Sequence, residues 1–81
     1  MENVIYNLYG TEGCHLCDDA ELLCQQLLNK DDYRNVDIVS DDTLVELYST
    51  SIPVLEHIES HTALYWPFNL QQLQEFIRGT N

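Results

Sequence analysis

The chain has 81 residues, which is enough for one compact domain and too few for two. Hydrophobic residues make up 44% of it, a globular share that argues against disorder, but the apolar runs are too short to cross a bilayer. The formal net charge of −11 argues against nucleic acid and anionic membranes as partners, because binding phosphates requires clustered lysine or arginine.

The first half of the chain predicts a strand, a turn, a helix and a second strand. Residues 3–9 are rich in β-branched and aromatic side chains, which favours a strand, and residues 10–13 predict a turn. From residue 14 to about residue 28 the apolar positions change to helical spacing. The apolar face of this helix is expected to carry Leu16, Cys17, Ala20, Leu23, Cys24, Leu27 and Leu28. A short strand is predicted over residues 33–39.

A short second helix is predicted next. Residues 40–42 are helix-capping types, and Thr43 with Glu46 has the spacing of a capping box. Pro53 disfavours a helical conformation at Ile52, so the chain is expected to continue extended from there.

The last third of the chain predicts a hairpin and a final helix. Strands are expected over residues 54–58 and 62–66, joined by a turn at residues 59–61. The final helix is expected to be capped by Asn69 and to end at Gly79.

This order of elements predicts a single α/β domain over residues 1–81. A strand, a helix and a strand of these lengths favour a parallel crossover, and the terminal hairpin adds antiparallel strands. We therefore expect a four-stranded mixed sheet flanked by three helices that cover both faces. The first helix begins at the carboxyl end of a strand, where open α/β sheets place their sites.

The cysteines suggest redox chemistry or metal binding. The N-terminal residues show no basic region followed by a long apolar stretch, so we expect a cytoplasmic protein. In a reducing cytosol, paired cysteines are more often redox-active or metal-binding than structural.

Cys14 and Cys17 form the strongest candidate site. A thiol at a helix N-terminus faces unpaired N–H groups and the positive end of the helix dipole, which favour the thiolate. Cys17 lies one turn further along and is placed to attack a mixed disulfide on Cys14. A protonated His15 would add to the stabilisation of the thiolate, whereas the carboxylates of Glu12, Asp18 and Asp19 oppose it. We therefore expect Cys14 to be less acidic than the corresponding thiol of strongly oxidising proteins.

Three segments of the chain carry a resemblance to a known family. They are residues 14–17 (Cys-His-Leu-Cys), 52–55 (Ile-Pro-Val-Leu) and 66–68 (Trp-Pro-Phe). In this order they resemble the thioredoxin superfamily, and more narrowly the small bacterial glutaredoxin-like family. The resemblance implies a thioredoxin-like fold of the minimal glutaredoxin type and a thiol-disulfide oxidoreductase activity.

The resemblance also implies residue roles. Cys14 would be the attacking thiol and Cys17 the resolving thiol. The bond between Ile52 and Pro53 would be cis, and its loop would lie against the dithiol, where the backbone of Ile52 pairs with substrate. The residues expected to bind substrate are Gly13, His15, Ile52, Pro53, Trp66 and Phe68.

Several of the other candidate residues have a structural alternative. Trp66 and Phe68 either form an apolar platform beside the dithiol or close the core under the last helix. Cys24 is either a core residue, which we favour, or a third redox partner or ligand. His57 and His61 flank the hairpin turn and are expected at the surface.

Glutathione is disfavoured as a partner. Glutaredoxins that bind it usually carry a lysine shortly before the first cysteine, and a Gly-Gly pair plus an aspartate at the last helix. Here residues 11–13 are Thr-Glu-Gly and residues 66–69 are Trp-Pro-Phe-Asn. We expect a monomer without a cofactor other than its dithiol, acting on a protein disulfide and on a reductase, each with a basic docking face.

Two other classes of function stay open. Zinc requires about four ligands, so His15, Cys24 and His57 would have to converge on the cysteine pair, and an iron-sulfur cluster would have to be shared by two chains. The second class is an interaction module with a thioredoxin-like fold, little turnover and an acidic docking face. We expect no metal.

Overall fold

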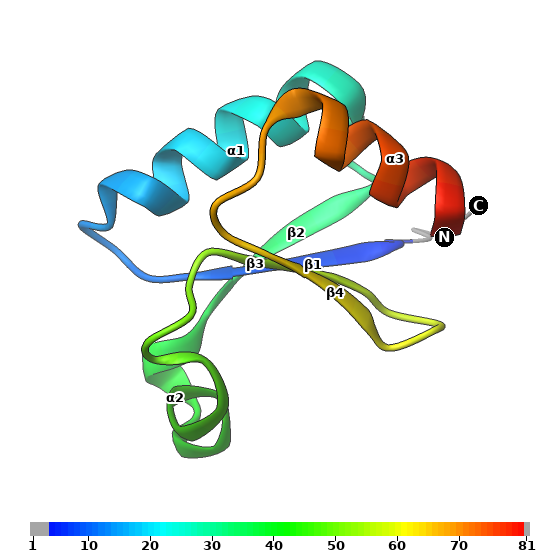
Figure 1. The fold of residues 1–81 in the computed structure, drawn as a ribbon. Coiled ribbons are helices and arrows are strands. Elements are labelled where there is room, and N and C mark those ends of the chain that lie inside the picture. Colours follow the sequence, from blue (N-terminus) through cyan, green and yellow to red (C-terminus); the bar gives the residue numbers. More distant parts are fainter. Residues whose placement is uncertain (1–3, 81) are drawn as a thin grey trace.

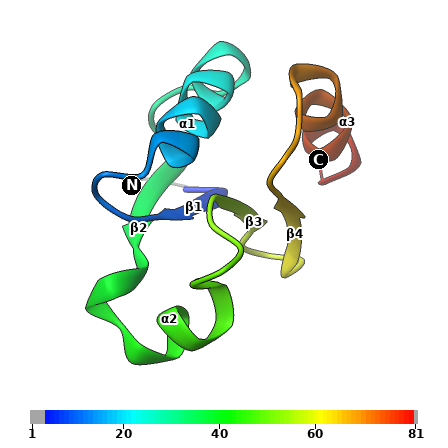
Figure 2. The same cartoon turned by 60° about the vertical axis from the view of Figure 1, so that its left-hand side comes forward.

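The computed structural model describes residues 4–80 and forms one four-stranded mixed sheet with helices on both faces (Figures 1 and 2). In chain order the elements are β1 (Tyr6–Gly10), α1 (His15–Leu27), β2 (Tyr33–Asp37), a 3-10 helix η1 (Ile38–Ser40), α2 (Asp42–Tyr48), β3 (Val54–His57), β4 (Thr62–Tyr65) and α3 (Leu70–Thr80). The predicted α/β fold is confirmed. Among the helices of residues 4–80, none has the length and apolar character needed to cross a membrane.

The strands lie in the order β2-β1-β3-β4. β1 and β2 are parallel, whereas β3 is antiparallel to both β1 and β4. Tyr9 at the end of β1 is opposite Val54 at the start of β3, which is opposite Tyr65 at the end of β4. The register therefore brings three connecting segments to the same end of the sheet: the β1–α1 loop, the segment before β3 and the segment after β4.

The two faces of the sheet have separate hydrophobic clusters. Tyr6 and Leu8 of β1 point to the face that α1 and α3 cover, where the other buried residues of the cluster are Ala20, Cys24, Tyr33, Leu55, Phe68 and Leu73. Tyr9 points to the opposite face and packs with Ile38 and Val54 under α2. This alternation follows from the period of two along a strand. β1 is thus buried on both faces.

The second strand and second helix differ from the sequence prediction. β2 ends at Asp37 rather than at residue 39, because the Asp37 carboxylate accepts a 3.0 Å hydrogen bond from the Val39 N–H and starts η1. α2 is capped by Asp41, whose carboxylate accepts bonds from the N–H groups of Thr43 and Leu44. The predicted Thr43–Glu46 capping box is wrong because Thr43 already lies inside the first turn.

The last helix begins as predicted and ends later than predicted. The Asn69 side chain accepts a 2.8 Å bond from the Gln72 N–H, and the Gln72 side chain accepts a 2.9 Å bond from the Asn69 N–H, which makes a reciprocal cap. The helix continues past Gly79 to Thr80. Thr80 Oγ1 lies 2.6 Å from the Tyr6 hydroxyl, so a contact with β1 holds the last turn in place.

Smaller corrections concern strand limits. The strand predicted over residues 3–9 is Tyr6–Gly10, and residue 3 lies outside the described residues. Gly10, expected in the turn, therefore belongs to β1. The hairpin strands each end one residue earlier than predicted, at His57 and Tyr65.

Two side chains are placed differently from the prediction. Leu16 is 48% exposed rather than part of the apolar face of α1. His57 is 6% exposed and lies 2.7 Å, through Nδ1, from the Ser60 hydroxyl, so its predicted surface position is wrong. His61 is exposed, as expected.

Candidate redox site

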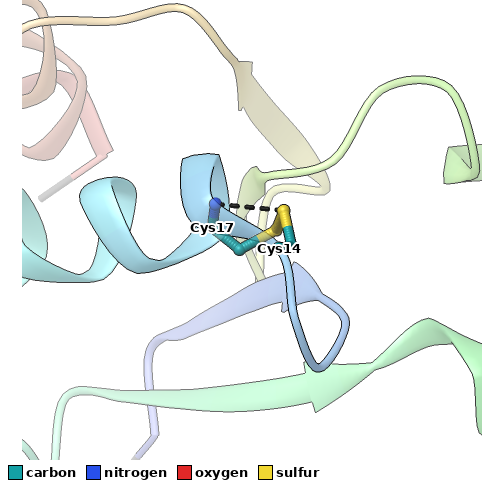
Figure 3. Close-up of a disulfide and its surroundings, with 2 residues drawn as sticks. All are labelled: Cys14 and Cys17. Atoms are coloured by element: carbon teal, nitrogen blue, oxygen red, sulfur yellow. Dashed lines mark hydrogen bonds between the residues drawn. A yellow bond between two sulfur atoms is a disulfide. The ribbon is translucent and has the colours of Figure 1, made fainter.

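The cysteine pair lies where the β1–α1 loop enters α1, and its two sulfur atoms form a disulfide (Figure 3). Gly13, which is exposed in the turn before the helix, adopts a φ of 80°, a left-handed conformation that favours glycine. Cys14 is the N-cap of α1, and Cys17 lies in its first turn at a Cα–Cα distance of 5.2 Å. The loop and the helix start thus hold two sulfurs within bonding distance.

The helix start provides a donor for the first sulfur. Cys14 Sγ accepts a hydrogen bond from the backbone N–H of Cys17 at 3.1 Å. This N–H belongs to the first turn of α1, whose N–H groups have no partner within the helix and carry the positive end of the dipole. A thiolate on Cys14 would gain from both contributions. Both cysteines are half-buried, and His15 between them is exposed.

The proline loop reaches the same end of the sheet. The Ile52–Pro53 bond is cis, as the resemblance implied. Pro53 directly precedes Val54, the partner of Tyr9 in the sheet, so the register places it beside Gly10 and the β1–α1 loop. The N–H of Ile52 donates to the Tyr48 carbonyl at 3.1 Å, so this backbone group is already used within the chain.

The two aromatic residues Trp66 and Phe68 differ in burial. The Trp66 N–H donates to the Pro53 carbonyl at 3.2 Å, which holds Trp66 beside the proline loop, and the Trp66 side chain is half-buried. Phe68 is 4% exposed in the core under α1 and α3, and its ring meets that of Trp66 edge-on at 5.1 Å. Phe68 is therefore a core residue that also packs against the ring of Trp66. The Trp66–Pro67 bond is also cis, which the sequence did not indicate.

Sequence reasoning missed the close approach between Gly10 and Cys17. A Cβ on Gly10 would lie 3.0 Å from Sγ and 3.1 Å from Cβ of Cys17, so α1 passes directly over the end of β1. A glycine at the end of an apolar strand is the only sequence signal for this close approach. Gly10 and Cys17 also line a cavity of about 240 Å³ whose walls carry the carboxylates of Glu12, Asp18, Glu21 and Asp37.

Cys24 belongs to the core, as favoured. It is fully buried between α1 and the sheet, and burial, with the charge of Glu21 as a smaller cause, raises the pKa of its thiol to about 12. A zinc site would require several ligands to lie close together. Among residues 4–80, no three Cys, His, Asp or Glu side chains are arranged to hold a metal ion.

The chain's three cations lie at the other end of β1. Tyr6, where β1 begins, pairs with Tyr33 and contacts Thr80. Lys30 and Arg34 line a second cavity there with Tyr33, and Arg78 lies in the last turn of α3. The fold thus separates the positive charges from the cysteine pair, around which Glu12 and Asp18 are exposed.

Solved structures of other proteins share the fold of this chain. The X-ray structure of the Northeast Structural Genomics target protein XcR50 from X. campestris has 28% sequence identity and a TM-score of 0.81, covering 91% of this chain and 96% of that chain. Its solution structure gives 27% identity and a TM-score of 0.81, covering 94% and 95%. The solution NMR structure of protein Ne2328 from Nitrosomonas europaea gives 25% identity and a TM-score of 0.68, covering 94% and 93%.

These likenesses confirm the thioredoxin-like fold with a four-stranded mixed sheet and three helices. No curated protein matches the sequence. The model of the family described as Glutaredoxin-like domain (DUF836) matches residues 6–78, which include the cysteine pair, the proline loop and Trp66. The chain belongs to this glutaredoxin-like family of the thioredoxin superfamily.

Proposed function

We propose that the protein is a thiol-disulfide oxidoreductase that uses Cys14 and Cys17 on protein disulfides. The observation that carries the proposal is the position of Cys14 at the N-cap of α1, where its sulfur accepts the Cys17 N–H and lies within bonding distance of Cys17 Sγ. A helix N-terminus stabilises a thiolate, and a second thiol one turn away can displace whatever the first one has bound.

The reaction proceeds in two exchanges. The Cys14 thiolate attacks one sulfur of the substrate disulfide, which forms a mixed disulfide and releases the other substrate sulfur as a thiolate. The Cys17 thiolate then attacks Cys14 Sγ, which forms the Cys14–Cys17 disulfide and releases the second substrate sulfur. Two electrons pass from the dithiol to the substrate, and an external dithiol or reductase returns them by the reverse exchanges.

A protein substrate fits the surroundings of the cysteines. Leu16 is exposed beside the disulfide, and the half-buried Trp66 is held next to the proline loop, so both offer apolar contact area. The N–H of Ile52 is bonded to Tyr48, so pairing with an extended substrate would use the Ile52 carbonyl.

The charge distribution disfavours glutathione and favours a partner with a basic face. Lys30, Arg34 and Arg78 lie at the far end of β1, whereas the cavity beside Cys17 is lined by carboxylates. Glutathione carries net negative charge and would meet repulsion at the dithiol. A protein with lysines or arginines around its own disulfide or dithiol would be attracted to the same end.

Trapping tests the proposal. The variant Cys17→Ser retains the attacking thiol and lacks the resolving one, so it is expected to accumulate a mixed disulfide on Cys14 with a substrate protein. The measurement is a mass-spectrometric search, in non-reducing conditions, for peptides linked to Cys14. Purified wild-type protein is expected to reduce a protein disulfide in the presence of a small dithiol, and Cys14→Ser is expected to be inactive.

A matched control separates the site from the remaining cysteine. Cys24→Ala removes a thiol that the structure buries in the core, and it is expected to retain the activity and the trapped partners. Full disulfide-reductase activity in Cys14→Ser would refute the proposal. A biological role that survives in the double variant Cys14→Ser, Cys17→Ser would instead support an interaction module.

A further inference from the structure

The Cys17 side chain occupies the space that a Cβ on Gly10 would need, where α1 crosses the end of β1. The 3.0 Å and 3.1 Å separations from a Cβ on Gly10 to Sγ and Cβ of Cys17 are shorter than the usual 3.5–4.0 Å between non-bonded heavy atoms, about half an ångström too short. A side chain at position 10 therefore requires Cys17 to move. Cys17 is the residue that closes the disulfide, so the contact bears on the redox equilibrium.

We propose that Gly10 is a positioning residue: the absence of a side chain at position 10 allows Cys17 to occupy the place from which it bonds to Cys14. The inference rests on the proposed oxidoreductase function and adds a determinant of its redox equilibrium and of its second exchange. Gly10 acts only through Cys17, since it is the Cys17 side chain that a Cβ would meet.

The disulfide form has less freedom than the dithiol form to make room for a Cβ at position 10. In that form Cys17 Sγ is bound to Cys14, so its side chain cannot rotate away. Withdrawal of the helix is opposed by Ala20 and Cys24 of α1, which are fully buried against the sheet. The dithiol form can relieve the contact with Sγ, since an unbound Cys17 side chain can rotate next to the cavity of about 240 Å³ that it lines, whereas the 3.1 Å contact with Cys17 Cβ is common to both forms.

A Cβ at position 10 should therefore destabilise the disulfide more than the dithiol. The same contact governs the second exchange, in which a bond forms between Cys17 Sγ and Cys14 Sγ while the bond from Cys14 to the substrate sulfur breaks. The first exchange requires only Cys14 and the substrate, because Cys17 forms no bond in it.

The test compares Gly10→Ala with Gly79→Ala. Both add one methyl group, but a Cβ on Gly79 meets nothing within 4 Å. Redox titration against a dithiol buffer is expected to show, for Gly10→Ala, a fall of about tenfold in the equilibrium constant for forming the disulfide, which corresponds to a potential about 30 mV higher. Gly79→Ala is expected to leave the potential unchanged.

Rapid mixing of the reduced protein with a symmetrical aromatic disulfide separates the two exchanges. Attack by Cys14 releases one coloured thiolate, and resolution by Cys17 releases a second. For Gly10→Ala the first release is expected to keep the wild-type rate, whereas the second slows by about tenfold, in line with the equilibrium. A merely structural loss of stability would not slow the second release selectively.

Each outcome decides between the proposals. An unchanged potential and an unchanged second release in Gly10→Ala overturn the role of Gly10 and leave the oxidoreductase function intact. Absence of any first release from the wild-type protein overturns the proposed function instead. If Gly10→Ala fails to fold when reduced, even combined with Gly79→Ala, the inference is wrong, because it requires the dithiol form to accommodate the added methyl group.

Discussion

The hydroxyl of Tyr9 donates a 2.7 Å hydrogen bond to Glu56 Oε1 across the β1–β3 pair, on the face of the sheet opposite α1. The Tyr9 ring stacks on Tyr48 with centroids 4.7 Å apart. Asn7 Nδ2 lies 3.4 Å from the same Glu56 oxygen, and Asn7 Oδ1 accepts a 2.9 Å bond from Arg34 Nε. This network satisfies polar groups on both inner strands of the sheet.

Removing the Tyr9 hydroxyl is expected to destabilise the protein. In Tyr9→Phe the ring stacking remains, but the half-buried Glu56 carboxylate loses its shortest hydrogen bond. We expect the free energy of unfolding to fall by about 2 kcal/mol, the size typical of a bond to a charged group. Urea denaturation measures the change. Tyr65→Phe is the control, since Tyr65 is 53% exposed, and it should have almost no effect.

The same residue predicts a dependence of stability on pH. Burial, followed by the hydrogen bond to Glu56, raises the pKa of Tyr9 to about 12 from its ordinary value of 10.0. Because the pKa is higher in the folded than in the unfolded state, the stabilisation is complete below pH 10 and is lost as the pH rises through 12. The difference in unfolding free energy between wild type and Tyr9→Phe should shrink over this window. A difference that stays constant up to pH 12 would contradict the assignment.

Cys24 is expected to resist alkylation in the native protein. Its thiol is fully buried, and its pKa is raised to about 12, so almost no accessible thiolate exists near neutral pH. After reduction, mass spectrometry should find alkylation at Cys14 and Cys17 in the folded protein and at all three cysteines in denaturant. Modification of Cys24 under native conditions would show that α1 opens readily.

The carboxylates beside the dithiol are expected to tune its reactivity. Glu12 and Asp18 lie two and four positions from Cys14 along the chain and line the cavity beside Cys17, and negative charge near a thiol opposes its ionisation. In a Cys17→Ser background, Glu12→Gln combined with Asp18→Asn should lower the midpoint of the pH profile for Cys14 alkylation by about half a pH unit, since exposed charges are screened by water. Glu59→Gln, in the hairpin turn at the far end of β3, is the control and should leave the midpoint where it is.

The reciprocal cap of α3 predicts a local stability effect. Asn69→Ala removes the side-chain acceptor for the Gln72 N–H. It thereby also breaks the reciprocal arrangement with the bond from the N–H of residue 69 to the Gln72 side chain. The free energy of unfolding should fall by about 1 kcal/mol. Gln71→Ala, at an exposed neighbouring position of the same helix, provides the comparison by thermal unfolding. Equal losses in the two variants would mean that the cap contributes nothing.

Local sequence patterns account for much of the fold. Periodicity located every strand and α-helix, and the parallel crossover followed from the lengths of the elements. The Cys14–Cys17 spacing at a helix start was likewise visible, because both residues lie on one turn of one helix. The limits of β2 and α2 were predicted less well than the elements themselves. Asp37 and Asp41 accept hydrogen bonds from nearby backbone N–H groups, and these bonds end β2 and start α2.

Contacts between distant residues were beyond local patterns. The extension of α3 through Gly79 depends on the contact of Thr80 with Tyr6, which are 74 positions apart. The burial of Phe68 and His57 depends on how α3 and the hairpin pack. Residue type alone left Phe68 either beside the dithiol or in the core, and it wrongly predicted that His57 lies at the surface.

The sequence by itself determined that two thiols lie one helical turn apart after a strand, because that spacing is fixed by the geometry of a single helix. Only the tertiary structure decided what surrounds them. The β1–β3 register brings Pro53 and Trp66 to the same end of the sheet as the dithiol, and the packing of α1 over β1 places the Cys17 side chain close to Gly10. These relationships depend on the register between strands and on the distance between layers, neither of which is encoded in any short stretch of residues.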